Sequence, residues 1–237
     1  MKAVCLVSGG LDSCVCAAIA KRRYSLAFLH VKYGQLTETR ELKAFRDVAD
    51  FYSVPKSLRL VVDVGYFKKI GGSSLTDRRV KIPKADLQRR GVPPTYVPFR
   101  NANILSMAVS WAEVIGARRI FIGAMEEDSS GYPDCREAFY SAFNKAVKLG
   151  TKPGSGIKVE APLIHKSKTE VVALGLKNGA PLHLSWSCYK SNGPAACGVC
   201  DSCALRLRGF RQAGAEDAIA YKVGPNYSSA DRKRTFI

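Results

Sequence analysis

The chain has 237 residues, 46% of them hydrophobic, which is enough for one core-forming domain with a small appendage. It contains no run of eighteen apolar residues, and its first residues do not read as a signal peptide, so we expect no membrane span and a cytoplasmic location. The formal charge of +17 raises nucleic acid as a partner, but the basic residues are spread along the chain, so we expect small anionic ligands instead.

Strand and helix patterns alternate along most of the chain. In chain order the hydrophobic periodicity predicts a strand at 3–7, a helix at 12–22, a strand at 24–31, a helix at 38–52, a strand at 58–62, a helix at 100–115, a strand at 119–123, a helix at 135–148, a strand at 157–160 and a helix at 167–178. Ser167 and Glu170 have the spacing of a capping box at the last helix. The alternation predicts an α/β fold with a Rossmann-like parallel sheet, helices on both faces and right-handed crossovers.

Two stretches depart from this alternation. Residues 63–98 are rich in glycine, proline and basic residues, and a long irregular insert in a compact domain is typical of a lid over a site. From residue 184 the chain becomes cysteine-rich, and it closes with a basic tail. We therefore expect one domain over 1–183, with the insert inside it, and a C-terminal segment over 184–237.

The stretch Ser8-Gly9-Gly10-Leu11-Asp12-Ser13 lies between the first strand and the first helix. Glycines let a backbone approach a phosphate closely, and a helix N-terminus presents free N–H groups and the positive end of its dipole. Neither G-x-G-x-x-G nor G-K-[ST] is present, which excludes the dinucleotide fingerprint and the common nucleotide P-loop. The stretch predicts an anion site, and an ordinary glycine turn is the simpler alternative.

Four of the eight cysteines crowd together near the end of the chain, and they are Cys188, Cys197, Cys200 and Cys203. Without a secretory signal a disulfide framework is not expected, and this spacing predicts a closed structural zinc site. An iron–sulfur cluster or a nucleic-acid-binding zinc ribbon are the alternatives. Cys135 stands apart from this group, and we interpret it as a packing or substrate-contact residue.

The string SGGLDS after an apolar strand resembles the pyrophosphate loop of the PP-loop ATP pyrophosphatases. PLIHKSKTE, at 162–170, resembles a second segment of these enzymes. Its Lys168 stands in the first turn of a helix, where the helix dipole disfavours a cation, so we expect a functional reason for it. The resemblance implies that ATP is cleaved between its α and β phosphates and that AMP is placed on an oxygen of the substrate.

Further sequence strings indicate which family of PP-loop enzymes the chain resembles. They are YGQ at 33–35, GGSSLTD at 71–77, TYVPFRN at 95–101, DSSGYPDCREAF at 128–139 and LSWSC at 184–188. In this order they resemble the 7-cyano-7-deazaguanine synthase family, over residue 3 to about residue 217. Four positions depart from the common family pattern. Lys32 stands where many members carry Asp, Leu36-Thr37 where many carry Arg-His, and Phe99 where many carry Gly or Ala.

The resemblance implies a ligase of the EC 6.3.4 type. It would convert 7-carboxy-7-deazaguanine and ammonia, with ATP and Mg²⁺, into 7-cyano-7-deazaguanine (preQ0), a precursor of queuosine and archaeosine. The steps would pass through an adenylated acid, an amide and an adenylated amide. The resemblance also implies a structural zinc, a homodimer, an ATP- and substrate-binding domain over 1–183 and a zinc-binding segment over 184–237.

The same resemblance implies roles for individual residues. Those expected to bind ATP are Ser8, Gly9, Gly10, Leu11, Asp12, Ser13, Arg100, Asn101 and Lys168. Those expected to bind the deazaguanine are Tyr33, Gln35, Asp128, Tyr132, Asp134 and Arg136. Asp12 and Lys168 are also expected to be catalytic. Two other functions stay open, a PP-loop enzyme that modifies tRNA and a zinc-binding module that binds nucleic acid.

Overall fold

A sheet of five parallel strands forms the centre of the fold, in the order β3-β2-β1-β4-β5. The computed structural model describes residues 1–89, 91–126 and 131–224. The strands are β1 (Lys2–Leu6), β2 (Ser25–Lys32), β3 (Arg59–Asp63), β4 (Arg119–Phe121) and β5 (Lys158–Glu160). The strand pattern in the sequence is therefore confirmed, and so is the Rossmann-like α/β class.

The helices are α1 (Leu11–Lys21), α2 (Glu38–Phe51), α3 (Tyr66–Ile70), α4 (Arg100–Ile115), α5 (Glu137–Gly150), α6 (Lys168–Lys177) and α7 (Asp201–Gln212). Five of them match predicted helices, while the sequence pattern did not indicate α3 or α7. The helix predicted from residue 135 begins at Glu137, because Pro133–Cys135 form a turn of 3-10 helix. Within the described part of the chain, no helix is both long enough and apolar enough to cross a lipid bilayer.

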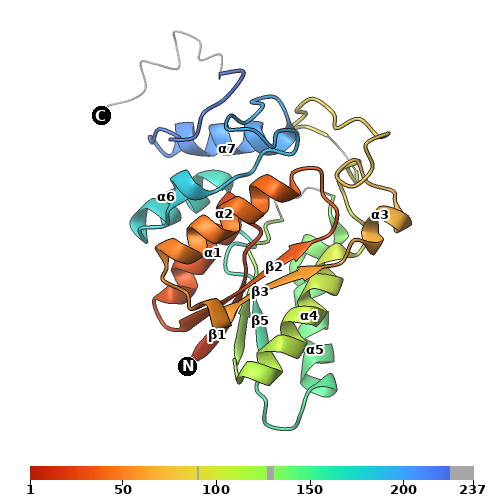
Figure 1. The fold of residues 1–237 in the computed structure, drawn as a ribbon, viewed down its shortest axis with the longest axis vertical. Coiled ribbons are helices and arrows are strands. Elements are labelled where there is room, and N and C mark those ends of the chain that lie inside the picture. The colour runs from red at the N-terminus through yellow and green to blue at the C-terminus, as the bar shows by residue number, and fades with distance from the viewer. Residues whose placement is uncertain (90, 127–130, 225–237) are drawn as a thin grey trace.

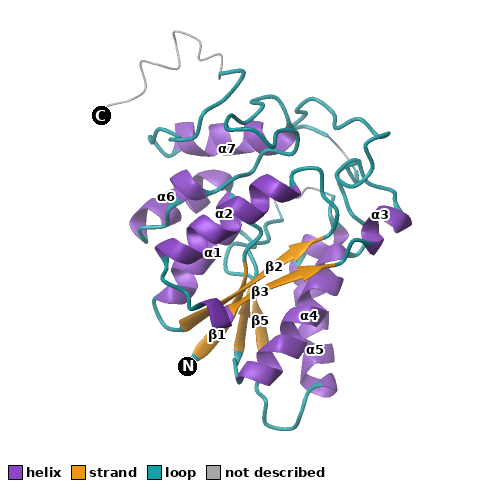
Figure 2. Ribbon diagram, in the orientation of Figure 1, coloured by secondary structure: helices purple, strands orange, loops and turns teal. Residues whose placement is uncertain are grey.

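Helices cover both faces of the sheet, as Figures 1 and 2 show, with α1, α2 and α6 on one side and α4 and α5 on the other. Side chains of a strand alternate between its two faces, and β1 follows this rule. Cys5 belongs to the core beneath α1, α2 and α6, whereas Val4 and Leu6 belong to the core beneath α4 and α5. Burial on both faces explains why β1 and β2 are nearly continuous apolar runs, whereas the edge strands β3 and β5 are partly exposed.

The connections from β1 set the position of a possible site. From β1 the chain passes through α1 to β2 and then β3, and it returns through α4 to β4 on the other side of β1. This reversal makes the gap between β1 and β4 a topological switch point. In open α/β sheets, ligands bind outside the carboxyl ends of the strands at such a point.

The insert at 63–98 is fixed to two other parts of the molecule. Its Phe67, Leu75 and Val97 pack with Tyr33 in a small apolar cluster. Its far end reaches the cysteine-rich segment, where the Ala85 N–H donates to Val199 O (2.9 Å) and the Asp86 N–H donates to Asp201 Oδ1 (2.8 Å). A lid function for the insert stays a prediction. Most of the basic tail, from 225, lies outside the described residues.

Candidate active site

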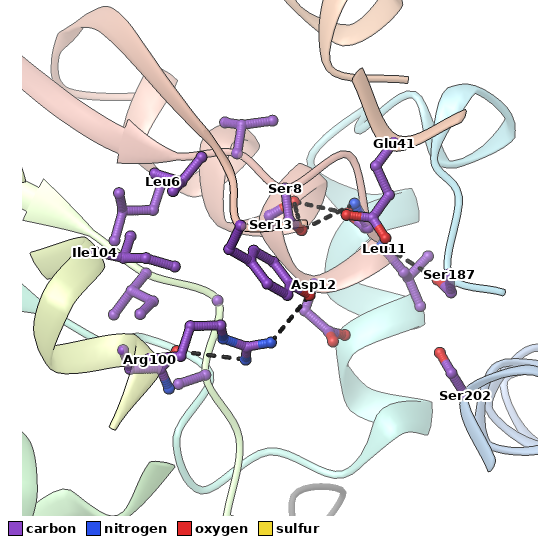
Figure 3. Close-up of a pocket in the computed structure, with 18 of the residues that line it drawn as sticks. Leu6, Ser8, Leu11, Asp12, Ser13, Glu41, Arg100, Ile104, Ser187 and Ser202 are labelled. Atoms are coloured by element: carbon purple, nitrogen blue, oxygen red, sulfur yellow. Dashed lines mark hydrogen bonds between the residues drawn. The ribbon is translucent and has the colours of Figure 1, made fainter. Parts of the chain in front are cut away.

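A cavity of about 250 Å³ opens at the switch point. Its apolar floor comes from the carboxyl ends of β1, β2 and β4, through Leu6, Leu29 and Ile122 among others. Its walls are polar and come from the phosphate loop (Ser8–Ser13), α4 and the C-terminal segment. Figure 3 shows Arg100 reaching toward the loop from α4, while Glu41 and Ser187 lie at the far side of the loop in this view.

The phosphate loop links β1 to α1 and has the geometry of an anion site. Gly9 has a φ of +91°, and a Cβ there would lie 2.6 Å from Glu41 O, so both conformation and space require glycine. Gly10 is the N-cap of α1 in extended conformation and provides no side-chain cap. The first turn of α1 therefore directs backbone N–H groups into the cavity, where the helix dipole favours a negative charge.

Two serines of the loop hold the turn in shape. Ser8 Oγ accepts a hydrogen bond from the Gly10 N–H (3.2 Å), and Ser13 Oγ donates to Gly10 O (2.9 Å). The two hydroxyl groups are also 3.3 Å apart. Both residues line the cavity. They can therefore contact a ligand, but part of their hydrogen-bonding capacity already stabilises the turn.

Lys168 and Asp12 form an ion pair between the N-terminal ends of α6 and α1. Lys168 Nζ donates to Asp12 Oδ1 at 2.6 Å, and only 8% of the lysine side chain is exposed. Lys168 is the first residue of α6, and the capping box of Ser167 and Glu170 ahead of it is confirmed. The cap explains Glu170, and the Asp12 carboxylate neutralises the charge of the buried Lys168, which does not itself line the cavity. A role of Lys168 toward ATP stays a prediction.

Arg100 is aimed into the cavity from the start of α4. It follows Phe99, which has a left-handed backbone with a φ of +55°, a conformation that glycine adopts readily and a bulky residue rarely does. Its guanidinium donates to the Tyr33 hydroxyl (3.3 Å) and lies 5.2 Å from the centre of the Tyr33 ring. Burial raises the pKa of Tyr33 to about 12, so its hydroxyl stays protonated.

Three tyrosines, Tyr33, Tyr132 and Tyr189, line the cavity together with Arg100. Burial raises the pKa of Tyr132 and Tyr189 as well, so each presents a neutral ring and a hydroxyl group. The Tyr132 hydroxyl is hydrogen-bonded to Thr95 Oγ1 at 2.7 Å. Flat aromatic faces beside a guanidinium suit a planar, anionic heterocycle.

Glu41 is a second cavity acid, beside Asp12, that no sequence pattern indicated. It accepts hydrogen bonds from Thr37 Oγ1 (2.6 Å) and Gln35 Nε2 (3.0 Å). The amide oxygen of Gln35 in turn accepts from the Tyr33 N–H at 2.8 Å. Burial raises the pKa of Glu41 above that of an ordinary glutamate. Its carboxylate has lone pairs left for further N–H donors.

The four cysteines converge as the sequence predicted, and they could hold a metal ion. Their Sγ atoms all lie within 4.8 Å of one another, and the Cys197 and Cys203 sulfurs are 3.9 Å apart. Four thiolates at zinc distance stand roughly 3.8 Å apart at the corners of a tetrahedron, so the donor set fits that ion. Backbone N–H groups of Lys190 and Cys197 donate to Cys188 Sγ, both at 3.3 Å, as thiolate ligands require.

Comparison with known proteins decides the family. A family model described as "Queuosine biosynthesis protein QueC" matches residues 2–214. The chain belongs to the QueC family. It is 59% identical over 228 residues to the 7-cyano-7-deazaguanine synthase of Chlorobium phaeobacteroides, covering 96% of this chain and 100% of the relative. With that of Chlorobium luteolum the identity is 57%, covering 96% and 99% of the two chains.

A solved structure also aligns with this QueC-family chain. It is the U34-tRNA thiolase NcsA from Methanococcus maripaludis with its [4Fe-4S] cluster, at 17% identity and a TM-score of 0.47. The alignment covers 100% of this chain and 82% of that one. At such a TM-score the likeness adds nothing to the assignment.

Not all residues that the sequence proposed for this QueC-family site line the cavity. Asp134 is buried outside it, where its carboxylate accepts from the Asn101 N–H at 2.9 Å at the start of α4. Arg136 is exposed and also lies outside the cavity lining. Gln35 acts through Glu41 and Tyr33, as described above. Asp128 lies outside the described residues. Gly9 and Lys168 are likewise absent from the lining, and the ligand contacts proposed for all the site residues stay predictions.

Several cavity residues come from the C-terminal segment, and sequence reasoning gave them no role in the site. They are Trp186, Ser187, Tyr189 and Ser202. The string LSWSC marked part of this stretch as a family feature, and that was the one available signal. Nothing local in the sequence indicated that Trp186 and Ser187 would lie against a loop 176 residues away.

Proposed function

We propose that this chain converts 7-carboxy-7-deazaguanine, ammonia and two ATP into 7-cyano-7-deazaguanine, two AMP and two pyrophosphate. The observation that carries the proposal is the match of nearly the whole chain to the QueC family, whose relatives here are named 7-cyano-7-deazaguanine synthases. The cavity supports it, because it joins an anion-binding loop to an aromatic, arginine-containing wall at one switch point.

The chemistry requires activation of one carbon twice. A carboxylate oxygen attacks the α-phosphorus of ATP, pyrophosphate leaves, and ammonia displaces AMP to give the primary amide. The amide oxygen then attacks a second ATP, and loss of AMP with two protons from nitrogen leaves the nitrile. Both substrate oxygens depart in AMP, so one site can serve both rounds.

The phosphate half of the cavity would stabilise the leaving pyrophosphate. Backbone N–H groups at the start of α1 and the hydroxyls of Ser8 and Ser13 are its donors. Lys168 would supply a positive charge to the phosphates, with Asp12 fixing its ammonium group at 2.6 Å. Bound Mg²⁺ would neutralise charge on the phosphate oxygens. Zinc at the four cysteines would be structural, since four protein ligands leave no open position.

The aromatic half would hold the deazaguanine. Arg100 is suited to the substrate carboxylate, because a guanidinium binds a carboxylate through two parallel hydrogen bonds. Tyr33, Tyr132 and Tyr189 would enclose the ring. The guanine-like edge presents N–H donors, and among the described residues Glu41 is the cavity carboxylate that is not paired with Lys168. We therefore assign Glu41, beside the earlier candidates, to that edge.

One assay separates this proposal from the two alternatives. The protein is incubated with ATP, Mg²⁺ and ammonium, with and without 7-carboxy-7-deazaguanine, and AMP and the nitrile are measured. Substrate-dependent AMP, two for each nitrile, supports the synthase. AMP that forms only when tRNA is added would point to a tRNA-modifying enzyme. Salt-sensitive RNA binding without any AMP formation would point to a nucleic-acid-binding module and would contradict the proposal.

A further inference from the structure

The C-terminal segment contacts the phosphate loop directly. The Trp186 N–H donates to Gly9 O at 2.7 Å, and Ser187 Oγ accepts from the Leu11 N–H at 3.5 Å. Trp186 is only 2% exposed, and the Arg40 guanidinium lies 4.3 Å from the centre of its ring. The backbone of the phosphate loop is thus held in part by residues that immediately precede Cys188.

Arg206 of α7 holds this contact stretch in place. It is 1% exposed and donates to Ser185 Oγ (2.8 Å), to Ser187 Oγ (3.4 Å) and to Leu182 O (3.0 Å). Asp217 neutralises its charge at 2.7 Å. Arg206 and Cys203 belong to the same helix, α7. A shift of the cysteine cluster that moves α7 would therefore also move Arg206 and its partner Ser187.

The same helix also supports Lys168. Gly209 of α7 lies so close to α6 that an added Cβ would stand 2.5 Å from Lys168 Cγ and 3.0 Å from Lys168 O. Figure 1 shows α7 lying along α6. Even one methyl group at this place would displace the lysine that pairs with Asp12. Gly209 is therefore a positioning residue for the Lys168 ammonium group, which reaches the cavity through its ion pair with the lining residue Asp12.

We propose that the metal-binding cysteines brace the nucleotide site, so that metal retention and nucleotide binding strengthen each other. A metal ion would fix Cys188, next to Ser187, and Cys203, in the helix of Arg206 and Gly209. These residues fix both the loop and Lys168. The inference rests on the proposed function in one respect, namely that the loop and Lys168 bind the phosphates of ATP.

Reciprocity gives the first test, because coupling between two binding sites acts equally in both directions. The zinc affinity of the full chain is measured by competition with a chromophoric chelator, in the presence of saturating ATP or adenosine, each with a protein-free control for zinc binding by the nucleotide. ATP should raise the zinc affinity at least about fivefold, within the range usual for coupled sites, and adenosine should not.

ATP binding to the zinc-loaded chain is measured in parallel, which separates the two possible failures. ATP that binds tightly and leaves the zinc affinity unchanged would overturn the brace while the proposed function stands. A chain that binds no ATP would remove the proposed function and, with it, the brace.

The second test uses Gly209→Ala and keeps the metal bound. Alanine favours a helix more than glycine does, so without crowding this change would stabilise α7. We expect instead that ATP affinity falls about tenfold, a loss within the range of coupled sites, while zinc content stays at one per chain. Gly150→Ala at the end of α5 is the matched control, since no atom lies within 4 Å of its added Cβ.

A double variant distinguishes positioning of Lys168 from general damage to the fold. In Lys168→Ala the long side chain next to Gly209 is absent. Adding Gly209→Ala to this variant should therefore lower its ATP affinity by less than about twofold relative to Lys168→Ala alone. Independent losses that multiply in the double variant, or a Gly209→Ala protein that binds ATP like the wild type, would overturn the role of Gly209.

Discussion

Lys168 is the residue on which the proposed chemistry depends most. It is buried beside the phosphate loop and held by Asp12. We expect Lys168→Ala to lower kcat about 100-fold or more, because a preorganised charge on the leaving group is removed, and to leave the zinc content unchanged. Steady-state AMP formation and metal analysis measure the two effects.

Lys177→Ala at the exposed end of the same helix is the control and should keep wild-type turnover. Loss of zinc from Lys168→Ala, or an unchanged kcat, would contradict this role.

His30 gives the folded chain a dependence on pH. Its ring is 1% exposed, lies 5.0 Å from the Phe45 ring, and donates from Nδ1 to Val7 O at 2.9 Å. Nε2 is buried with no hydrogen-bond partner among the described residues. Burial lowers the pKa of His30 below its ordinary value of 6.5. The ring is therefore neutral in the fold at a pH where it is charged in the unfolded chain.

The sign of the effect follows from proton linkage. Below about pH 6.5 the unfolded chain takes up a proton at His30 that the folded chain does not, so the free energy of unfolding falls as the pH decreases. His30→Gln should show less of this fall between pH 7.5 and 5.5 in urea unfolding. Identical pH profiles for His30→Gln and the wild type would refute the assignment.

The capping box of α6 is an element that the sequence predicted and that can be tested alone. Ser167 Oγ accepts from the Glu170 N–H at 3.3 Å, and the Glu170 carboxylate accepts from the Ser167 N–H at 2.9 Å. Removing the cap with Ser167→Ala should lower the free energy of unfolding by about 1 kcal/mol. Ser110→Ala, an exposed serine within α4, should not lower it, because alanine favours a helix interior. Chemical denaturation of both variants measures the difference.

Elements with apolar periodicity were predictable, and those without it were not. The central strands β1 and β2 are nearly continuous apolar runs because both of their faces are buried, and five of the helices carry an apolar periodicity. The sequence of α7 does not indicate a helix, because the charged Arg206 occupies a buried position and Gly209 lowers the local helix propensity. The helix forms because the ion pair with Asp217 and the close approach to α6 stabilise it. These are tertiary contacts that no local window contains.

The same distinction holds within the candidate site. The phosphate loop and the cysteine cluster were predictable because each is a short, continuous signal. Glu41 and Tyr189 were not, because their role follows from where the fold places them. Asp134 was predicted to bind substrate because of the motif around it, but its carboxylate accepts a hydrogen bond from the backbone at the start of α4.

At the scale of the whole molecule, a buried ion pair ties the last described segment to the core. Arg206 and Asp217 are 1% and 4% exposed at their side chains. Asp217→Ala leaves a buried guanidinium without a counter-charge and should lower the free energy of unfolding by about 3–5 kcal/mol.

Asp47→Ala breaks the exposed pair with Lys43 on α2 and should change stability by only about 0.3–0.5 kcal/mol. Urea unfolding of both variants gives the comparison. Equal losses would mean that the Arg206 pair does not tie the segment to the core.

The contact between the phosphate loop and Ser187 also orders events during synthesis. Chains emerge from the ribosome with the N-terminal part first, and Leu11 is made 176 residues before its partner. The loop can reach its braced shape only after the ribosome has passed the cysteine-rich stretch. A nascent chain stalled before that stretch already contains all five strands, so it should carry a formed sheet and no competent nucleotide site. ATP capture would therefore distinguish finished molecules from unfinished ones.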